Sequence, residues 1–493
     1  MNRPAQGTGA ATGKMIGPEE MLAHVERACA RLFAAGDRYG GLIPSILERE
    51  SGAIPPSLPA PIPGQRTSDR AYPGCNLIHD EATLKTADAL AAFLGRRDFA
   101  EGVSAYLQRF ATHCTGTETG LFPWGEHAFW HLEDDRVGNS YLLANPAHKG
   151  GAIHDHLRQA PLWLWERLHA YNPRCVERFG EGLDFHWQEG EPREYIRHAA
   201  IEEQRRQRRG ARACDFPRHS GFYIFDWAFA YTKTRRPDFL GQISAMLDYW
   251  WEKRDAHNLL LIESRSPADD ARFYRTNAPG QTLSLAASLF ESADLLAALE
   301  PDLARTMRER AHAYAEGFFA APHDPSSGVF VILSKQGSGE IVEAMPVWGS
   351  VYGLWPVSYV ALTCLCVYRF TRDERLLRWA QEAGRHYAEV PFPEEHAVPA
   401  MDTGLGIGLL ADLYELTGER GWLDAGVHLA GESIARYFGG GINGEKPAIP
   451  RGASGIDYYD AQMGPGFLLH GLARLAMLAL GGACPLDADY TAR

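Results

Sequence analysis

The chain has 493 residues, of which 45% are hydrophobic and 11% aromatic, and this is enough to bury a substantial core. Its formal net charge at pH 7 is −13, which disfavours the basic face that nucleic-acid binding needs, so we predict no nucleic-acid partner. No apolar run reaches the length of a membrane span, and we predict no membrane association.

The first residues lack the apolar core of a secretory signal. The segment MNRPAQGTGAATGKMIG is small and polar, so we expect residues 1–16 to be flexible. We expect a cytoplasmic protein, or a periplasmic or secreted one if a signal was removed. The eight cysteines include no CxxC pair, and free thiols in the core are the expectation.

Pairs of helices joined by tight turns recur along the chain. An amphipathic helix is predicted over residues 18–35, followed by a proline-rich arm over residues 55–74. From Asn76 onward, the predicted pairs are 84–94 with 99–110, 163–168 with 176–185, 224–232 with 239–251, 283–299 with 301–319, 357–370 with 376–390, and 405–416 with 422–438. A last helix, residues 467–480, pairs with the N-terminal one.

The first helix of most pairs is apolar nearly all round, as in LSLAASLF and GLGIGLLADLY. Such a helix is typically buried on both sides. Repeated helical hairpins form either an open solenoid or a closed ring, and the apolar first helices favour the ring. We therefore predict an all-α fold, one α/α toroid (barrel) of about six to seven helical hairpins over residues 17–482, with a C-terminal tail over residues 483–493.

The connections between hairpins are much longer than the turns within them. They span residues 115–153, 190–218, 256–280, 321–353, 391–403 and 439–461. In a ring these loops emerge on one face, and loops on a rigid scaffold often carry function. The predicted substrate-binding residues are Asn76, His79, Trp124, Glu126, Trp130, Asn145, His148, Arg275, Trp348, Tyr352 and Asp402.

These residue types suit an acidic sugar. Aromatic faces pack on sugar rings, and arginine, histidine and asparagine bind a carboxylate. Such a set permits β-elimination, in which the carboxylate is neutralised, a base removes the neighbouring proton and an acid protonates the leaving oxygen. A tyrosine whose pKa is lowered by the positive cluster could serve as base and then acid. The predicted catalytic residues are His127, His154, Arg218, His219, Tyr274 and Tyr458.

Some of these residues have structural alternatives. His127 and His131 could bind a divalent cation together with Glu133 or Asp134, but no third ligand has motif spacing. We therefore predict no metal site and no cofactor, with a divalent cation left possible. The His154 segment could simply cap the helix that follows it.

Four segments carry a family resemblance: PGCNLIHDEATL, TGLFPWGEHAFW, the His154 segment and FPRHSGFYIFDWAFAYTKT. They resemble segments of bacterial α/α-toroid proteins described as pectate-lyase-like. The layout is also similar to that of the α/α-barrel alginate and glucuronan lyases. The resemblance implies a carbohydrate-active enzyme of the polysaccharide lyase class, with His127, His154, Arg218 and His219 as the carried-over positions.

The predicted function is therefore a lyase that cleaves uronic-acid-containing oligo- or polysaccharides by β-elimination. Two other enzyme classes share the same scaffold. A glycoside hydrolase needs two carboxylates, which Glu126, Asp226, Asp402 and Asp457 could supply. An N-acylglucosamine-type epimerase would use His127, His154 and His219. The sugar, its linkage, endo or exo action and the oligomeric state are left open.

Overall fold

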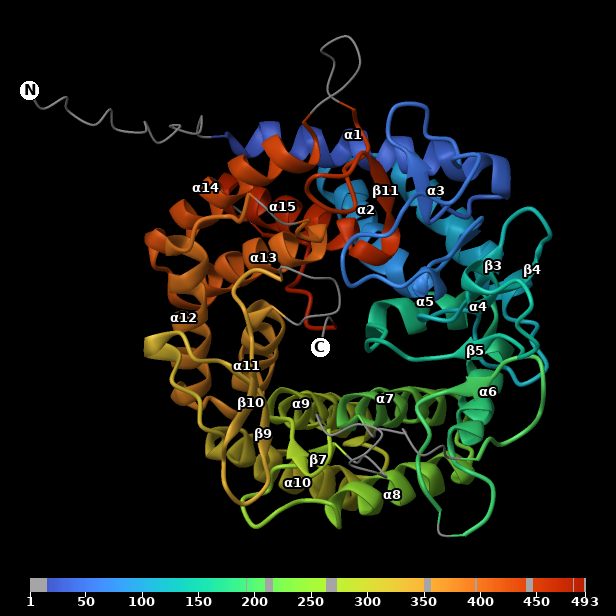
Figure 1. The fold of residues 1–493 in the computed structure, drawn as a ribbon, viewed down its shortest axis with the longest axis vertical. Helices are drawn as coiled ribbons and strands as arrows, with labels where there is room; N and C mark the ends of the chain where they lie inside the picture. The colour runs from blue at the N-terminus through green and yellow to red at the C-terminus, as the bar shows by residue number, and fades with distance from the viewer. Residues whose placement is uncertain are drawn as a thin grey trace, which may run out of the picture.

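The computed structural model describes residues 16–191, 193–208, 216–262, 273–349, 356–394, 397–439, 447–481 and 483–491. Its helices form a closed ring around a central axis (Figure 1). The helices next to the axis are α2 (Leu77–Leu94), α5 (Leu162–Tyr171), α7 (Pro217–Thr234), α9 (Pro279–Leu296), α11 (Val357–Thr371), α13 (Ala400–Thr417) and α15 (Pro465–Leu480). The predicted α/α toroid is confirmed.

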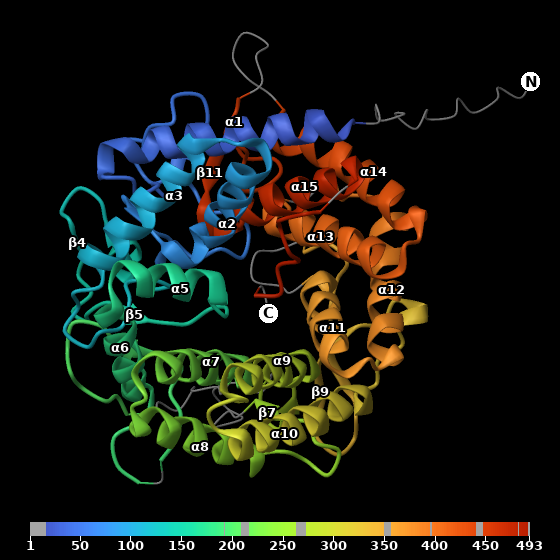
Figure 2. The same ribbon diagram turned by 180° about the vertical axis from the view of Figure 1, so that it is seen from behind.

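Each inner helix has an outer partner, so the ring consists of seven hairpins (Figure 2). The outer helices are α3 (Arg97–Arg109), α6 (Pro173–Gly182), α8 (Pro237–Trp251), α10 (Pro301–Ala320), α12 (Glu374–Glu389), α14 (Arg420–Tyr437) and α1 (Pro18–Gly36). The N-terminal helix α1 packs on α15, as predicted, and so closes the ring with the two ends of the helical region.

The inner helices are buried because they have helices on both sides. Every residue of α9 from Pro279 to Phe290 is buried. Helices α13 and α15 approach so closely that a Cβ atom on Gly404 would lie 2.3 Å from the backbone nitrogen of Leu468. The ring therefore depends on small residues at this contact as well as on apolar ones.

The long connections contain short strands that were not predicted. One sheet joins β2 (Gly74–Cys75), β3 (Ala128–His131) and β4 (Arg136–Asn139), and a second joins β7 (Leu261–Ile262), β8 (Thr276–Asn277), β9 (Val331–Lys335) and β10 (Ile341–Ala344). Two further pairs are β1 (Ile46–Glu48) with β11 (Tyr458–Asp460), and β5 (Ile153–His154) with β6 (Ala199–Ala200). The remaining helix, α4 (Tyr141–Ala144), is a single turn.

Several inner helices begin earlier than predicted. Helix α2 begins at Leu77 rather than residue 84, α7 at Pro217 rather than 224, and α13 at Ala400 rather than 405. The prediction began each helix where its continuous apolar pattern starts, whereas the first turns of these helices mix apolar residues with polar side chains. His79, Arg218 and Asp402 therefore lie in the first turn of a helix instead of in the loop before it.

The C-terminal tail, residues 483–491, runs into the middle of the ring (Figures 1 and 2). Tyr490 bonds to two inner helices: its hydroxyl accepts from Arg369 Nε of α11 at 2.6 Å and donates to Asp412 of α13. Thr491 Oγ donates to Glu81 of α2 at 3.2 Å. Arg369 and Asp412 lie toward the C-terminal ends of their helices and Glu81 lies near the start of α2, so the tail occupies the ring axis between these positions.

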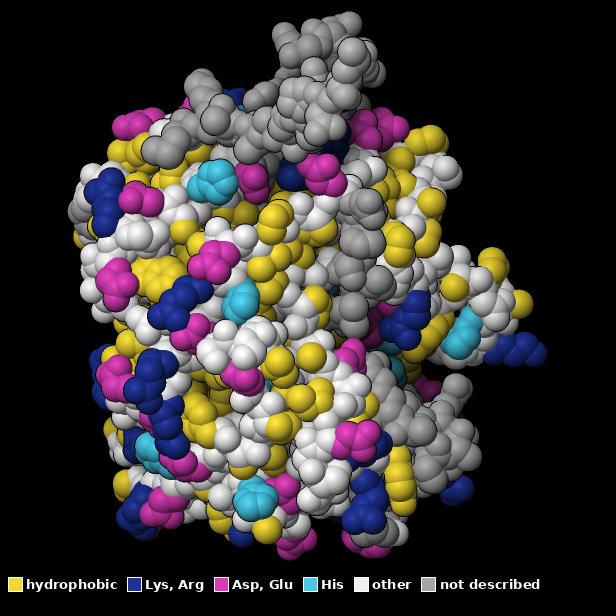
Figure 3. Space-filling view, turned by 60° about the vertical axis from the view of Figure 1, so that its left-hand side comes forward, with side chains coloured by type: hydrophobic (Ala, Val, Ile, Leu, Met, Phe, Trp, Pro, Cys, Tyr) yellow, Lys and Arg dark blue, Asp and Glu magenta, His cyan; other side chains and the backbone are white. Residues whose placement is uncertain are grey.

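No helix among the described residues is both long enough and apolar enough to cross a bilayer. On the side of the ring shown in Figure 3, basic and acidic side chains are interspersed over the described surface, without a continuous basic field. The cysteines within the described ranges are free thiols, and Cys484 alone of them is only partly buried. Residues 1–15, most of the predicted flexible N-terminus, lie outside the described ranges.

Candidate active site

A cavity of about 260 Å³ opens at the N-terminal ends of the inner helices. Successive inner helices each contribute a side chain from their first turn, namely His79 of α2, Arg218 of α7, Gln281 of α9, Tyr359 of α11 and Asp402 of α13. Arg158 and Gln462 come from just before α5 and α15. This is the arrangement expected from the spacing, because the long connections converge here.

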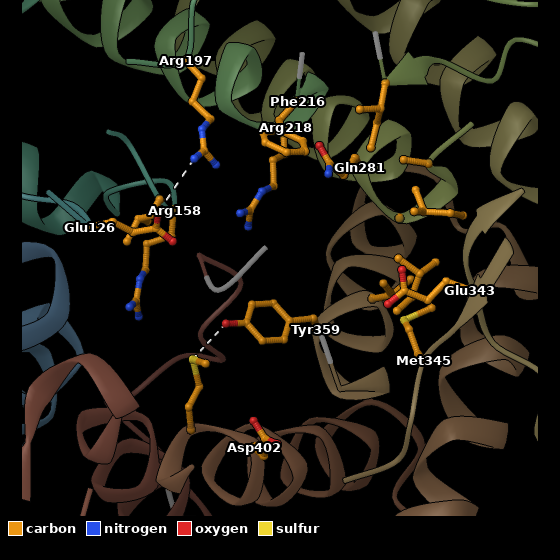
Figure 4. A pocket seen from close by; sticks show the side chains of 18 of the residues that line it. Glu126, Arg158, Arg197, Phe216, Arg218, Gln281, Glu343, Met345, Tyr359 and Asp402 are labelled. Atoms are coloured by element: carbon orange, nitrogen blue, oxygen red, sulfur yellow. Dashed lines mark hydrogen bonds and ion pairs between the residues drawn. The ribbon is translucent and has the colours of Figure 1, made fainter. Parts of the chain in front are cut away.

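Three arginines line this cavity, and Figure 4 shows Arg158, Arg197 and Arg218 with their guanidinium groups directed into it. Burial lowers the pKa of Arg218 to about 10, so this guanidinium remains charged at neutral pH. Arg197 lies 3.9 Å from Glu126 Oε2 and 3.9 Å from Asp155 Oδ2. Burial lowers the pKa of Arg197, but the two carboxylates raise it by more, so the net pKa of this guanidinium is raised.

Tyr359 projects from α11 into the same space (Figure 4). Its hydroxyl donates a hydrogen bond to Met401 Sδ at 2.9 Å. Burial raises the pKa of Tyr359, while the neighbouring Arg158 and Arg218 lower it without reversing the shift. The phenol is therefore protonated at neutral pH and can donate its proton.

Asp402 is the most buried carboxyl group in the cavity wall, with 1% of its surface exposed. Its Oδ2 accepts a hydrogen bond from the Gly349 backbone amide at 2.7 Å. Burial raises the pKa of Asp402 well above its usual range, although the amide opposes the shift. Asp402 is thus a second proton donor in the same cavity.

The electrostatics of the cavity favour an anion. The positive ends of five inner-helix dipoles and three arginines face it, against the carboxyl groups of Glu126 and Glu343, and burial raises the pKa of the third carboxyl group, Asp402. Arg158 Nη2 donates to His79 Nδ1 at 2.8 Å, so the hydrogen of the neutral ring is on Nε2. Burial lowers the pKa of His79 well below its usual value and keeps it neutral.

Four of the predicted site residues line this cavity: His79, Glu126, Arg218 and Asp402. Two more lie directly behind it. His219 is fully buried, with Nδ1 3.6 Å from Asp155 Oδ1, and His127 lies 3.6 Å from Glu126 Oε2. Burial and Arg218 lower the pKa of His219, so only one cation stands at the start of α7 rather than the two expected.

His154 and Trp124 belong to the core. His154 is fully buried; its Nε2 accepts from Trp124 Nε1 at 2.8 Å, and its Nδ1 lies 2.8 Å from His186 Nε2. Burial lowers the pKa of His154 well below its usual value. These contacts hold the loop before α5 against the ring and leave His154 outside the cavity wall.

Other predicted residues lie away from the cavity. Asn76 donates to the Gly125 carbonyl at 2.8 Å, Trp130 to Asp135 at 3.0 Å, and Trp348 to the Val390 carbonyl at 3.2 Å. Tyr458 donates to the Ala60 carbonyl at 2.6 Å. Tyr274, Arg275 and Asn145 are exposed, and His148 packs on Tyr141 at the outer surface. Tyr352 lies outside the described residues.

Several residues of the cavity were not singled out from the sequence, among them Arg158, Arg197 and Tyr359. Arg158 comes just before α5, and Tyr359 is in the first turn of α11. For these two helices the prediction took residues from the preceding connections, such as His154 and Trp348, and did not reach Arg158 or the first turn of α11. Arg197 lies just before the two-residue strand β6 and gives no local signal.

No protein-family profile matches the chain, and no curated protein matches it in sequence. Among solved structures, a sugar epimerase from a ruminal bacterium is 11% identical, over 77% of this chain and 88% of that chain, with a TM-score of 0.46. An unsaturated glucuronyl hydrolase from a Bacillus species is 12% identical, over 93% and 96%, with a TM-score of 0.45. A GH76 α-mannanase from Bacteroides thetaiotaomicron is 14% identical, over 64% and 82%, with a TM-score of 0.40. The three activities differ.

Proposed function

We propose that this protein is an enzyme that binds a carboxylate-bearing sugar of an oligo- or polysaccharide and cleaves its glycosidic bond by β-elimination. One observation carries the proposal. The phenol of Tyr359 is held in the same cavity as the guanidinium groups of Arg158 and Arg218 (Figure 4). A carboxylate binder and a proton donor are two of the three groups that this chemistry requires.

Arg158 and Arg218 bind the sugar carboxylate. A guanidinium group forms paired hydrogen bonds with a carboxylate, and burial strengthens them. Neutralising the carboxylate acidifies the hydrogen on the adjacent ring carbon, since the negative charge that develops there is delocalised onto the carboxyl group. Phe216 and Met345 supply an apolar wall against which a sugar ring packs.

Glu126 and Tyr359 move the protons. Glu126 lies in the wall that carries Arg158, and Tyr359 comes from α11 (Figure 4). The Glu126 carboxylate takes the acidified C–H proton. The electron pair of that C–H bond forms the new carbon–carbon double bond as the glycosidic C–O bond breaks. Tyr359 gives its proton to the departing oxygen, and the acquired proton on Glu126 returns to solvent and then to Tyr359.

The proposal is tested by incubating the protein with alginate, glucuronan, pectate and glycosaminoglycans, as polymers and as oligomers. β-Elimination leaves a double bond conjugated with the carboxylate, so ultraviolet absorbance rises, whereas hydrolysis of a saturated substrate leaves it unchanged. We expect a rise with at least one acidic substrate and none with neutral glycans. A flat trace across the panel would contradict β-elimination.

Tyr359→Phe is the first variant to examine. It removes only the hydroxyl, so the rate of double-bond formation should fall by about 100-fold or more, the usual contribution of a positioned acid. Tyr274→Phe and Tyr458→Phe are matched controls, because neither tyrosine lines the cavity. Equal loss in the controls, or full activity in Tyr359→Phe, would contradict the assignment.

A hydrolase is the second candidate, and the buried Asp402 favours it. A carboxyl group whose pKa is raised by burial is what a glycosidase uses as its general acid. Glu126 would then activate water. New reducing ends without any ultraviolet change, abolished by Asp402→Asn, would identify this chemistry. Retained cleavage in Asp402→Asn would exclude Asp402 as the acid.

A further inference from the structure

Next to the cavity, a cluster of ligand-type side chains has no part in the proposed reaction; two of its members are buried and the third, His198, is partly buried. His127, Asp155 and His198 each place one ligand atom within 4.8 Å of the others. Asp155 is fully buried and His127 is 2% exposed. The cluster is distinct from the pairing suggested by the sequence, since His131 lies farther along β3 and its Nδ1 accepts the Asp134 amide at 3.1 Å.

The backbone brings these three residues together. Strands β5 and β6 are antiparallel, with His154 opposite Ala199. Asp155 directly follows β5 and His198 directly precedes β6, so both residues leave the sheet at the same end. Gly125, at φ +102°, lies so close to this point that a Cβ atom there would be 2.1 Å from the Asp155 carbonyl oxygen. The backbone at Gly125 therefore runs directly beside Asp155, and this close approach places the loop carrying His127 next to Asp155.

Asp155 is the least satisfied group of the cluster. Neither of its carboxylate oxygens makes a hydrogen bond of good geometry among the described residues, and its polar neighbours stand at ion-pair distances. The nearest cations or potential cations are His198 Nε2 at 3.4 Å, His219 Nδ1 at 3.6 Å and Arg197 Nε at 3.9 Å. A buried carboxylate without hydrogen bonds is costly, and such groups are normally paired or bound to a metal ion.

Both histidines offer a ring nitrogen toward this carboxylate. His127 Nδ1 lies 3.1 Å from the Ser68 carbonyl oxygen, so it donates there and leaves the lone pair on Nε2. A hydrogen bond of this kind orients the histidine ligands of metal sites. His127 also stacks on Tyr141, with ring centroids 4.5 Å apart. His198 Nε2 is buried with no hydrogen-bond partner in the described part of the chain.

We propose that His127, Asp155 and His198 bind a divalent transition-metal ion, with Zn²⁺ as the best match. Two imidazoles and one carboxylate are a common zinc ligand set, and three protein ligands leave further positions for water. The imidazoles distinguish the site from Mg²⁺ and Ca²⁺ sites, which are built from oxygen ligands. This inference does not depend on the lyase proposal.

The full chain is first treated with a chelator and dialysed against metal-free buffer. It is then titrated with Zn²⁺, and the heat of binding is measured by calorimetry. We expect one ion per chain. Asp155→Asn and His198→Ala should each weaken binding at least about 10- to 100-fold, since loss of an outer partner alone has that effect. His131→Ala is the matched control, because His131 lies on the same hairpin outside the cluster, and it should bind as the unmodified chain does.

Two results would overturn the proposal. One is the absence of Zn²⁺ binding by folded protein, with folding checked by circular dichroism. The other is equal affinity in Asp155→Asn, His198→Ala and the His131→Ala control. Where a variant does not fold, Co²⁺ added to the unmodified chain decides the question. Visible ligand-field absorption that Zn²⁺ displaces supports the site, and a colourless Co²⁺ titration contradicts it. Neither readout requires a sugar substrate.

Discussion

At position 218, a single substitution can separate the effect of the positive charge from the effect of the planar guanidinium shape. Lysine in place of Arg218 keeps the positive charge but loses the planar fork that binds a carboxylate through two hydrogen bonds. We expect Arg218→Lys to lower kcat/KM for an acidic sugar by about 10-fold, equivalent to the loss of one charge-assisted hydrogen bond. Initial rates on the substrate found in the panel measure this.

The control is Arg420→Lys, because Arg420 has 76% of its side chain exposed and lies on an outer helix. It should leave kcat/KM unchanged. If Arg218→Lys were as active as the unmodified protein, two-point recognition of a carboxylate by this residue would be excluded.

Buried neutral histidines make the stability of the protein sensitive to acid. Burial lowers the pKa of His186 to about 3, while an unfolded histidine titrates near 6.5. Below pH 6.5 the unfolded state therefore binds more protons, and the free energy of unfolding decreases as the pH falls toward 3. His186 alone should lower it by about 2 kcal/mol between pH 7 and pH 5.

Denaturant unfolding at pH 7 and pH 5 measures this effect. His186→Gln keeps polar atoms at the site but cannot titrate there, so the difference between the two pH values should shrink. His428→Gln is the control, because 63% of the His428 side chain is exposed. An unchanged pH difference in His186→Gln would contradict the assignment.

The sequence located only some of the residues that line the cavity. His79, Arg218 and Asp402 were selected from the region around the start of an inner helix and Glu126 from a long connection, and all four line the cavity. Tyr274 and Tyr458 were chosen as residues of the long connections. A loop residue's side-chain direction depends on tertiary contacts, such as the bond from Tyr458 to the Ala60 carbonyl, which the sequence does not reveal.

At the scale of elements, an ionic cluster at the C-terminal ends of the inner helices ties three of them together. Asp412 of α13 accepts hydrogen bonds from Arg369 of α11 at 2.8 Å and from Arg474 of α15 at 2.9 Å. Asp412 and Arg474 are both fully buried. Removing one member of a buried ion pair costs about 3–5 kcal/mol when the other charge is left uncompensated. Glu415 also contacts Arg369 at 3.2 Å and Arg474 at 2.8 Å, so it retains part of the compensation when Asp412 is removed.

We therefore expect Asp412→Ala to lower the free energy of unfolding by more than the exposed control and by at most about 3–5 kcal/mol, measured by denaturant titration. Asp424→Ala breaks the exposed pair with Arg420 on α14, and should change stability by less than about 1 kcal/mol. A loss in Asp412→Ala no greater than that of the control would show that the cluster does not hold these helices together.

The helices themselves were largely predictable, but the starts of the inner ones were not. Apolar periodicity identifies the buried middle of a helix and fails where a polar first turn is buried around a cavity. In α2 this turn carries His79 and Asp80, and in α7 it carries Arg218 and His219. The places where the pattern failed are therefore the places that line the candidate site.

For the whole molecule, the ring followed from the helices that are apolar nearly all round, and the convergence of the long connections at one end of the ring followed from their length. The small sheets did not follow, because strands as short as β5 and β6 have no period to detect. The cluster of His127, Asp155 and His198 was missed for the same reason, since its geometry is set by the pairing of those two strands.

The position of the C-terminal tail bears on whether a polymer could pass through the ring. Because residues 483–491 occupy the axis beyond the cavity, the ring is a blind pocket instead of a tunnel. Under the proposed function, a glycan would not be threaded through the ring, and its fragments would leave by the mouth of the cavity through which the substrate enters. Successive cuts on one strand would then need release and rebinding, so we expect distributive rather than processive cleavage.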